Sequence, residues 1–365
     1  MRLLNKLLVV SVLLLSLGLL LVANGQNPPA PANPPAANPP AGQANPPAGQ
    51  EDENVNVPPP PNQPGNTVQV PPGQPSQQNV EQGDNGTFTF KKKVEEVVLH
   101  ATVVDQRQQL VTGLRQNDFA VYEDGRPMPI TSFHQEDIPV AMGIVIDNSG
   151  SMRDKRQKVN QAAVNLVRAS NPHDEVFVVN FNDEYWLDQD FTSDLSRLRE
   201  GLDHIESRGG TALYDAVVAS ADHLAKGARL EKKVLLIVTD GEDNASRESL
   251  EQCVRRLQDL NGPTVYSIGI LGDDREAHRA KRALTALALQ TGGVAFFPKD
   301  LNEVDNITRQ VAHDIRNQYT IGYKPSDPNR PGYRTVRVEA HSPSYKHLVV
   351  RTRTGYYAGQ ERAAR

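Results

Sequence analysis

The chain has 365 residues, with 39 basic and 44 acidic side chains and a formal net charge of -5. From Lys91 onward it has 37 basic and 39 acidic side chains, a nearly neutral balance that argues against nucleic-acid binding, which needs a basic surface. Of the 27 prolines, 17 lie between Pro28 and Pro75, and no aromatic residue precedes Phe88. This first part therefore cannot bury enough apolar surface to fold alone.

Residues 1–25 have the pattern of an export signal. Arg2 and Lys6 precede an apolar run from Leu7 to Ala23, which ends among small residues. The run is also close to the length of a membrane-spanning helix, so a cleaved signal and an uncleaved anchor both remain open. We expect an exported protein, in the periplasm, in the cell envelope or secreted, with membrane contact only through this segment. Cys253, the single cysteine, permits no internal disulfide and is expected to be a buried apolar residue.

Residues 26–86 are predicted to be a disordered, proline-rich linker. The tetrapeptide Asn-Pro-Pro-Ala occurs four times, starting at Asn27, and Pro58 to Pro61 is a tetraproline. Such a composition favours polyproline II, in which this segment could reach on the order of 150 Å. Two interpretations are open: a stalk that holds a domain away from a membrane or wall, and a linker without a selected length.

Two β-rich flanks, 87–136 and 318–358, enclose a central segment, and 359–365 is a short tail. In the first flank we expect a hairpin from Phe119, through the turn Glu123-Asp124-Gly125, to a return strand at Ile130 to Phe133. In the second, apolar residues alternate from Tyr319 and again around Val336. Because the ends of a compact domain usually emerge close together, we predict that the flanks pair into one small β-sandwich.

The central segment, 137–317, alternates strands with helices. Val140 to Ile146 and Val234 to Thr239 are apolar throughout, as in strands that are buried on both faces. Amphipathic helical patterns such as Lys155 to Ala169 lie between the strands. The sequence therefore predicts an α/β domain with a Rossmann-like, doubly wound, mostly parallel sheet of strand order 3-2-1-4-5-6. Trp186 and the Phe296-Phe297 pair are expected in its core.

Polar side chains follow two of the apolar strands directly. The first strand runs into Asp147-Asn148-Ser149-Gly150-Ser151, and the fourth runs into Asp240-Gly241. These strands are neighbours at the switch point of the predicted order, so both aspartates should face one crevice. Gly209-Gly210-Thr211, before a predicted helix, can add a third hydroxyl. A carboxylate pair in such a crevice is costly unless a cation or proton compensates its charge.

This set of two carboxylates and three hydroxyls contains only oxygen ligands. Such ligands suit Mg²⁺, with Mn²⁺ or Ca²⁺ possible, and do not suit zinc. The two negative charges would just balance the metal, so an open position would attract another anion, such as a carboxylate of a partner protein. The predicted metal ligands are Asp147, Ser149, Ser151, Thr211 and Asp240.

At these residues the sequence resembles the von Willebrand factor A domain with its metal-ion-dependent adhesion site, over about Pro139 to Asn317. The family pattern is Asp-x-Ser-x-Ser, a distant Thr, and a strand that ends in Thr-Asp-Gly, and all five ligand positions match it. The resemblance implies that the serines and the threonine bind the metal directly and that the aspartates act largely through water. It also implies that an Asp or Glu of a partner completes the metal shell.

The segment before the domain is similar to bacterial von Willebrand factor A-related proteins. The matching residues are Leu114, Asp118, Phe119 and the Glu123-Asp124-Gly125 turn. That group is mostly without an assigned function, so this similarity says little about the partner.

The predicted function is an exported, metal-dependent protein-binding module for adhesion or assembly, and not an enzyme. One alternative is a scaffold of a cell-envelope complex in which the metal only stabilises the fold. A phosphatase-like enzyme with an aspartate nucleophile is a further rival, but Ser149 stands where the second carboxylate of an Asp-x-Asp motif would be needed. The chain has no phosphate-binding Gly-rich loop, no His-Glu-x-x-His motif and no Gly-x-Ser-x-Gly motif.

Overall fold

The computed structural model describes residues 80–82, 88–90, 96–203 and 207–359. The predicted export signal or anchor, nearly all of the predicted linker and most of the predicted tail lie outside these residues. Strand β1 (Val80–Gln82), within the range predicted as linker, pairs antiparallel with β2 (Phe88–Phe90). None of the helices in the described part is both long enough and apolar enough to cross a membrane.

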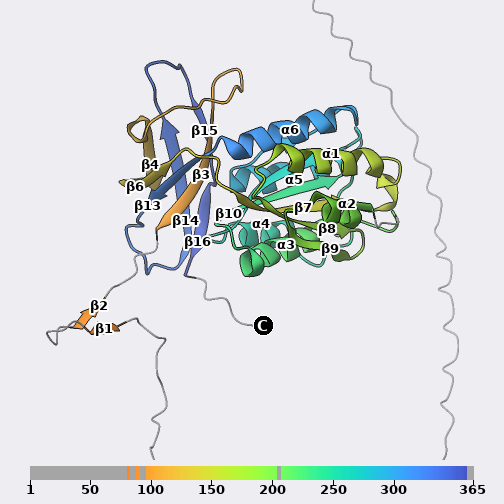
Figure 1. The fold of residues 1–365 in the computed structure, drawn as a ribbon, viewed down its shortest axis with the longest axis horizontal. Helices are drawn as coiled ribbons and strands as arrows, with labels where there is room; N and C mark the ends of the chain where they lie inside the picture. The colour runs from red at the N-terminus through yellow and green to blue at the C-terminus, as the bar shows by residue number, and fades with distance from the viewer. Residues whose placement is uncertain (1–79, 83–87, 91–95, 204–206, 360–365) are drawn as a thin grey trace, which may run out of the picture. The chain divides into compact units, whose positions relative to one another are not determined.

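A six-stranded sheet forms the centre of the α/β domain (Figure 1). Its order is β12-β11-β10-β7-β8-β9. With β7 counted as the first strand and the sheet read from β9, this is 3-2-1-4-5-6, so the predicted topology is confirmed. All neighbours are parallel except β8 and β9. The strands are β7 (Val140–Asp147), β8 (Glu175–Phe181), β9 (Tyr185–Thr192), β10 (Lys232–Thr239), β11 (Thr264–Gly269) and β12 (Ala295–Phe296).

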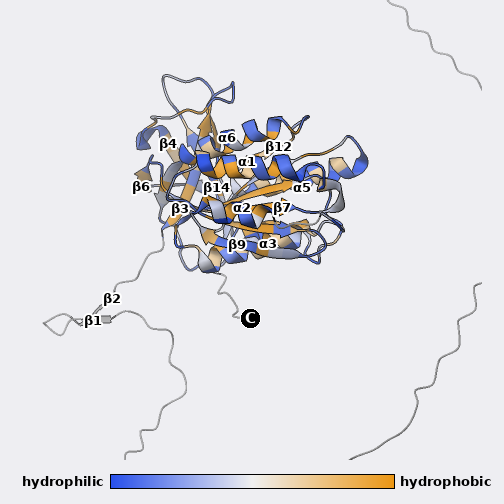
Figure 2. Cartoon of the chain, turned by 45° about the vertical axis from the view of Figure 1, so that its right-hand side comes forward, coloured by the Kyte–Doolittle hydropathy of each residue, from blue (hydrophilic) through white to orange (hydrophobic). Residues whose placement is uncertain are grey.

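Helices cover both faces of this sheet. One face packs against α1, α2 and α6, and the other against α3, α4 and α5. In Figure 2 the helices have a hydrophobic side toward the sheet and a hydrophilic side away from it, as expected for amphipathic helices. The helices are α1 (Arg156–Ala169), α2 (Leu195–Asp203), α3 (Leu213–Gly227), α4 (Leu250–Leu257), α5 (Arg275–Thr291) and α6 (Glu303–Arg316).

The burial of the central strands follows from their sequences. Every residue of β7 is buried, as an apolar strand between two helical layers must be. Cys253, a residue of α4, is fully buried in the core, as predicted. The prediction for Trp186 was wrong: this side chain is 39% exposed, and it lies on β9, an edge strand of the sheet.

The two flanks build a β-sandwich from two four-stranded sheets, β15-β3-β13-β6 and β16-β14-β4-β5. Each sheet contains strands from both flanks, so the predicted pairing is confirmed. The elements are β3 (Val97–Val104), the 3-10 helix η1 (Gln116–Asp118), β4 (Phe119–Glu123), β5 (Arg126–Met128), β6 (Ile130–His134), β13 (Tyr319–Tyr323), β14 (Gly332–Ala340), β15 (Val349–Arg351) and β16 (Gly355–Ala358).

The predicted hairpin has a different return strand. β4 turns at Asp124-Gly125 and pairs with β5, whereas β6 crosses to the other sheet and pairs with β13. Asp124 and Gly125 have φ of 49° and 78°, and positive φ at both positions gives a tight two-residue hairpin turn. Proline removes a backbone donor, so Pro129 ends the short β5 and allows the chain to change sheets.

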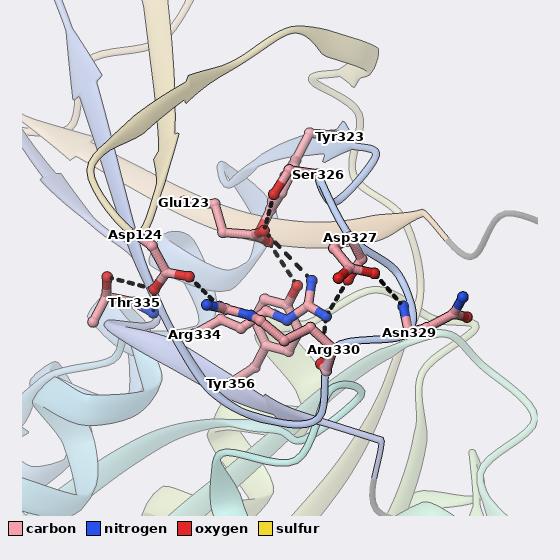
Figure 3. Close-up of polar contacts among 10 residues, drawn as sticks. All are labelled: Glu123, Asp124, Tyr323, Ser326, Asp327, Asn329, Arg330, Arg334, Thr335 and Tyr356. Carbon is pink, nitrogen blue, oxygen red and sulfur yellow. Dashed lines mark hydrogen bonds and ion pairs between the residues drawn. The ribbon is translucent and has the colours of Figure 1, made fainter.

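A buried polar cluster joins the two sheets of the sandwich (Figure 3). The Glu123 carboxylate accepts hydrogen bonds from the hydroxyls of Tyr323 and Tyr356, both at 2.8 Å. Arg334 lies 3.4 Å from the same carboxylate, and both side chains are 1% exposed. Arg334 also donates to the carbonyl of Arg330, at 2.6 Å. The cluster therefore ties β4, β13, β14 and β16 to the loop before β14.

The sandwich is fastened to the α/β domain at the chain crossings. α6 leads into β13, and Arg351 of β15 pairs with Asp314 of α6 at 2.9 Å. Arg353 donates to the carbonyls of Asp259, Leu260 and Gly262 in the loop after α4. These contacts place the sandwich at the end of the sheet opposite to the carboxyl ends of β7 and β10.

Candidate functional site

The two predicted aspartates lie at one edge of the central sheet. β7 and β10 are parallel neighbours, with Ile146 beside Val238. Asp147 ends β7, and Asp240 follows the last residue of β10. β8 continues the sheet on the far side of β7 and β11 on the far side of β10, so the aspartates stand at the point where the winding reverses. In doubly wound sheets this point is the usual place for ligands.

Asp147 is fully buried, and its two oxygens have separate donors. Oδ1 accepts a hydrogen bond from the backbone N–H of Ser149 at 2.7 Å, and Oδ2 accepts one from Thr239 Oγ1 at 2.6 Å. Burial raises the pKa of the Asp147 carboxyl above its ordinary value, Asp240 adds to this rise, and the hydrogen bonds oppose it. A nearby cation would stabilise the ionised form of this carboxyl.

Ser149, Ser151 and Asp240 form a chain of oxygens beside Asp147. The hydroxyls of Ser149 and Ser151 are 3.2 Å apart, and Ser151 Oγ donates to Asp240 Oδ1 at 2.7 Å. Adjacent oxygens in an octahedral Mg²⁺ shell are about 2.9 Å apart, since each lies roughly 2.0–2.1 Å from the metal. The spacing of these oxygens therefore fits such a shell. Ser151 is exposed, so this end of the chain is open to solvent.

Thr211 reaches the same edge from the loop before α3. Its N–H donates to Asn244 Oδ1 at 2.8 Å, and its carbonyl accepts from the Asn244 N–H at 3.0 Å. Its hydroxyl would lie 3.5 Å from a Cβ atom placed on Gly241, so the side chain lies against the residues that follow β10. The structure thus brings all five predicted residues to one edge of the sheet. Asp147, Ser149, Ser151 and Asp240 are linked by hydrogen bonds.

Two glycines are required before Thr211 because the backbone there passes close to the Asp183 side chain. Gly209 has φ of 72°, and a Cβ there would lie 2.0 Å from a carboxylate oxygen of Asp183. The N–H of Gly210 donates to Asp183 Oδ1 at 2.7 Å. Asp183 follows β8, so the loop that carries Thr211 is pinned to the neighbouring strand end.

Two cations lie beside the two carboxylates. Lys155 Nζ makes an ion pair with Asp240 Oδ2. Arg156, which is buried, donates to Asn180 Oδ1 at 3.0 Å and to the carbonyl of Leu202 at 3.3 Å. Burial lowers the pKa of Arg156 to about 10, and attraction to Asp147 opposes this shift. The inner site therefore contains two negative and two positive side chains.

Glu242 and Asp243 follow Asp240 closely in the sequence, and both have partners. Glu242 pairs with Arg279 at 2.5 Å. Asp243 Oδ2 accepts from the N–H of Tyr214 at 3.0 Å, in the first turn of α3. A carboxylate at a helix N-terminus stabilises that helix, so Asp243 positions α3 and the loop before it.

Three residues support the site in roles that were not predicted from the sequence: Thr239, Lys155 and Asn244. Thr239 could have been recognised as the only hydroxyl in an apolar strand. Lys155 and Asn244 have no such signal, because their contacts join segments far apart in the sequence. Among the described residues no three or more His, Cys, Asp or Glu side chains cluster as a metal site, so a cation here would depend on hydroxyl oxygens.

Residues 142–242 match the family model of the von Willebrand factor type A domain. This central part of the chain is similar to a von Willebrand factor type A domain. The match runs from β7 to just beyond β10 and contains all five site residues. It covers the part of the chain that builds the switch point.

Similar proteins were found by sequence and by structure. The chain is 22% identical over 189 residues to the uncharacterized protein sll0103 of Synechocystis, covering 50% of this chain and 43% of that one, so less than half of the relative's length is matched. BatB of Bacteroides thetaiotaomicron is 17% identical, with 48% and 97% covered and a TM-score of 0.40. A von Willebrand factor type A protein of Catenulispora acidiphila is 15% identical, with 73% and 75% covered and a TM-score of 0.42.

Proposed function

We propose that this protein is an exported binding module that captures an acidic side chain of a partner protein through a divalent metal, with Mg²⁺ the best fit. The supporting observation is the meeting of five oxygen-bearing side chains at the carboxyl ends of β7 and β10. The proposed ligands are Asp147, Ser149, Ser151, Thr211 and Asp240. Mn²⁺ and Ca²⁺ also accept such oxygen ligands.

The roles of the side chains follow from their burial and contacts. Asp147 is held rigidly by Ser149 N–H and Thr239, so it supplies a fixed negative charge below the hydroxyls. Ser151 is exposed and faces solvent, where a partner could approach. When bound, the metal would supply positive charge that attracts the partner's carboxylate. Because the hydroxyl ligands are neutral, they would not neutralise this charge. The export signal predicted at residues 1–25 supports action outside the cytoplasm.

Metal binding is tested first on the purified chain. Thermal unfolding is followed in EDTA, Mg²⁺, Mn²⁺ and Ca²⁺, and at a metal concentration of 100 Kd the folded state should gain about 2.7 kcal/mol. Ser149→Ala should lose this gain, while Ser196→Ala, which changes an exposed serine of α2, should keep it. An unchanged unfolding temperature in every metal would contradict the metal part of the proposal.

Partner capture is tested by crosslinked pull-down from the native cell envelope. The wild type in Mg²⁺ should retain a partner that is lost in EDTA and with Asp147→Ala or Ser149→Ala, each checked for folding by circular dichroism. Equal retention under all conditions would favour the alternative function, a scaffold in which the metal only stabilises the fold.

A further inference from the structure

Lys155 covers one of the two carboxylates of the candidate site. The residue precedes α1, and its ammonium pairs with Asp240 Oδ2. The other oxygen of Asp240 accepts the Ser151 hydroxyl at 2.7 Å. The Asp240 side chain is 0% exposed as a result. Both oxygens of a proposed metal ligand thus already have partners within the protein.

The two cations at the site differ in their freedom to move. Arg156 is buried under the site and is fixed by Asn180 and by the Leu202 carbonyl. The Lys155 side chain is 28% exposed and makes no capping hydrogen bond to α1. A lysine side chain has a flexible four-carbon stem, so Lys155 can exchange Asp240 for solvent whereas Arg156 cannot.

An ammonium and a divalent metal would compete for the same carboxylate. Both are positive, and two like charges within a few ångströms of each other repel strongly near a protein surface. We propose that Lys155 is a tethered cation that occupies Asp240 when no metal is bound and must leave when the metal binds. It thereby weakens metal binding and keeps the negative site compensated in the empty protein. This inference rests on the proposed metal site and concerns its regulation.

The test measures metal affinity by isothermal titration calorimetry with Mg²⁺ and Mn²⁺. Lys155→Met should bind each metal roughly two- to fivefold more tightly, the range expected for releasing one partly exposed ion pair. Lys155→Arg retains a cation and should stay near the wild type. Lys158→Met is the matched control: it removes a charge from the same helix, but Lys158 contacts Asn302 and not the site, so affinity should change less than with Lys155→Met.

A second measurement uses the unaltered chain and needs no variant. An amine-acylating reagent is applied with Mg²⁺ or with EDTA, and mass spectrometry follows acylation at each lysine. Lys155 should react faster in Mg²⁺, because the metal releases its amine, while the reactivity of Lys158 should not change.

Equal metal affinity of wild type and Lys155→Met, or equal acylation of Lys155 in both conditions, would overturn the role of Lys155 and leave the metal site standing. Absence of metal binding by every folded chain would instead overturn the proposed function and, with it, this inference.

Discussion

Thr239 shows how a single buried hydroxyl supports the candidate site. It is the last residue of β10, is 0% exposed, and donates to Asp147 Oδ2 at 2.6 Å. Its hydroxyl also accepts the Gly241 N–H at 3.2 Å. Thr239 therefore fixes both the Asp147 carboxylate at the end of β7 and the backbone turn at the end of β10.

Replacing Thr239 by Val should remove these contacts without changing the shape of the side chain. The buried Asp147 oxygen would lose a donor, so the free energy of unfolding should fall by about 1–3 kcal/mol, and metal binding should weaken. Urea denaturation and metal titration measure the two effects. Thr239→Ser keeps the hydroxyl and should retain most of both properties; a Val variant as stable as the wild type would contradict this role.

Asp174 is a buried carboxyl at the opposite edge of the sheet. It is 4% exposed and accepts the N–H of Val140 at 2.8 Å, at the start of β7. Burial raises its pKa to about 6 from an ordinary value of 3.8. The folded state thus holds the proton more tightly than the unfolded state, and the resulting stabilisation, complete below about pH 4, is lost as the pH rises through 6.

We expect this loss to appear as a pH-dependent difference between the wild type and Asp174→Asn. Between pH 4 and pH 7 the free energy of unfolding of the wild type should fall relative to the variant by on the order of 2–3 kcal/mol. Urea denaturation of both proteins across this range measures the difference between their free energies of unfolding. Groups that titrate alike in the two proteins do not contribute to this difference. A difference that stays constant with pH would contradict the raised pKa.

At the scale of elements, the Glu123–Arg334 pair joins the strands of the sandwich (Figure 3). Both side chains are buried between sheets that otherwise pack through apolar residues. Removing one member of a buried ion pair leaves the other uncompensated, which usually costs more than the pair itself contributes.

Arg334→Met should therefore lower the free energy of unfolding by about 3 kcal/mol or more. The double variant Glu123→Gln with Arg334→Met should recover part of this loss, because the uncompensated charge is gone. Arg337→Met serves as the control, since Arg337 lies on the same strand with its side chain 58% exposed and should matter by less than about 1 kcal/mol. Additive effects of the two sandwich changes, measured in a double-mutant cycle, would show that the pair is not coupled.

At the scale of the whole molecule, the sandwich depends on both sides of the α/β domain in the sequence. β3 pairs with β13 and β15, and β4 pairs with β14, so the first flank finds its partners more than 200 residues later. Such long-range pairing closes only after the intervening domain has brought its ends together.

Deleting residues 318–365 should accordingly unfold the first flank as well. Hydrogen exchange at residues 97–134 should rise toward that of an unfolded chain, because β3, β4 and β6 lose their partners and expose unpaired edges. A chain that ends at residue 359 is the control and should exchange like the full chain. Protected amides in 97–134 of the shorter chain would show that the first flank folds alone.

The sequence by itself determined the α/β architecture, because apolar strands and amphipathic helices have distinct periodicities that local residues set. It also placed the five site residues at strand and helix ends, and the known strand order of doubly wound sheets then predicted that they meet. The pairing of the flanks was predicted because the two ends of a compact domain usually emerge close together.

Only the tertiary structure decided which strands lie at an edge and which partners cross the chain. Trp186 is an apolar residue in a strand, and its exposure follows from the position of this strand, β9, at the edge of the sheet. The return strand of the β4 hairpin depended on a sheet change after Pro129. Lys155 reaches Asp240 across 85 residues of sequence, a contact that exists only because α1 starts beside the end of β10. Pattern and spacing describe neighbours along the chain, whereas compensation of charge depends on neighbours in space.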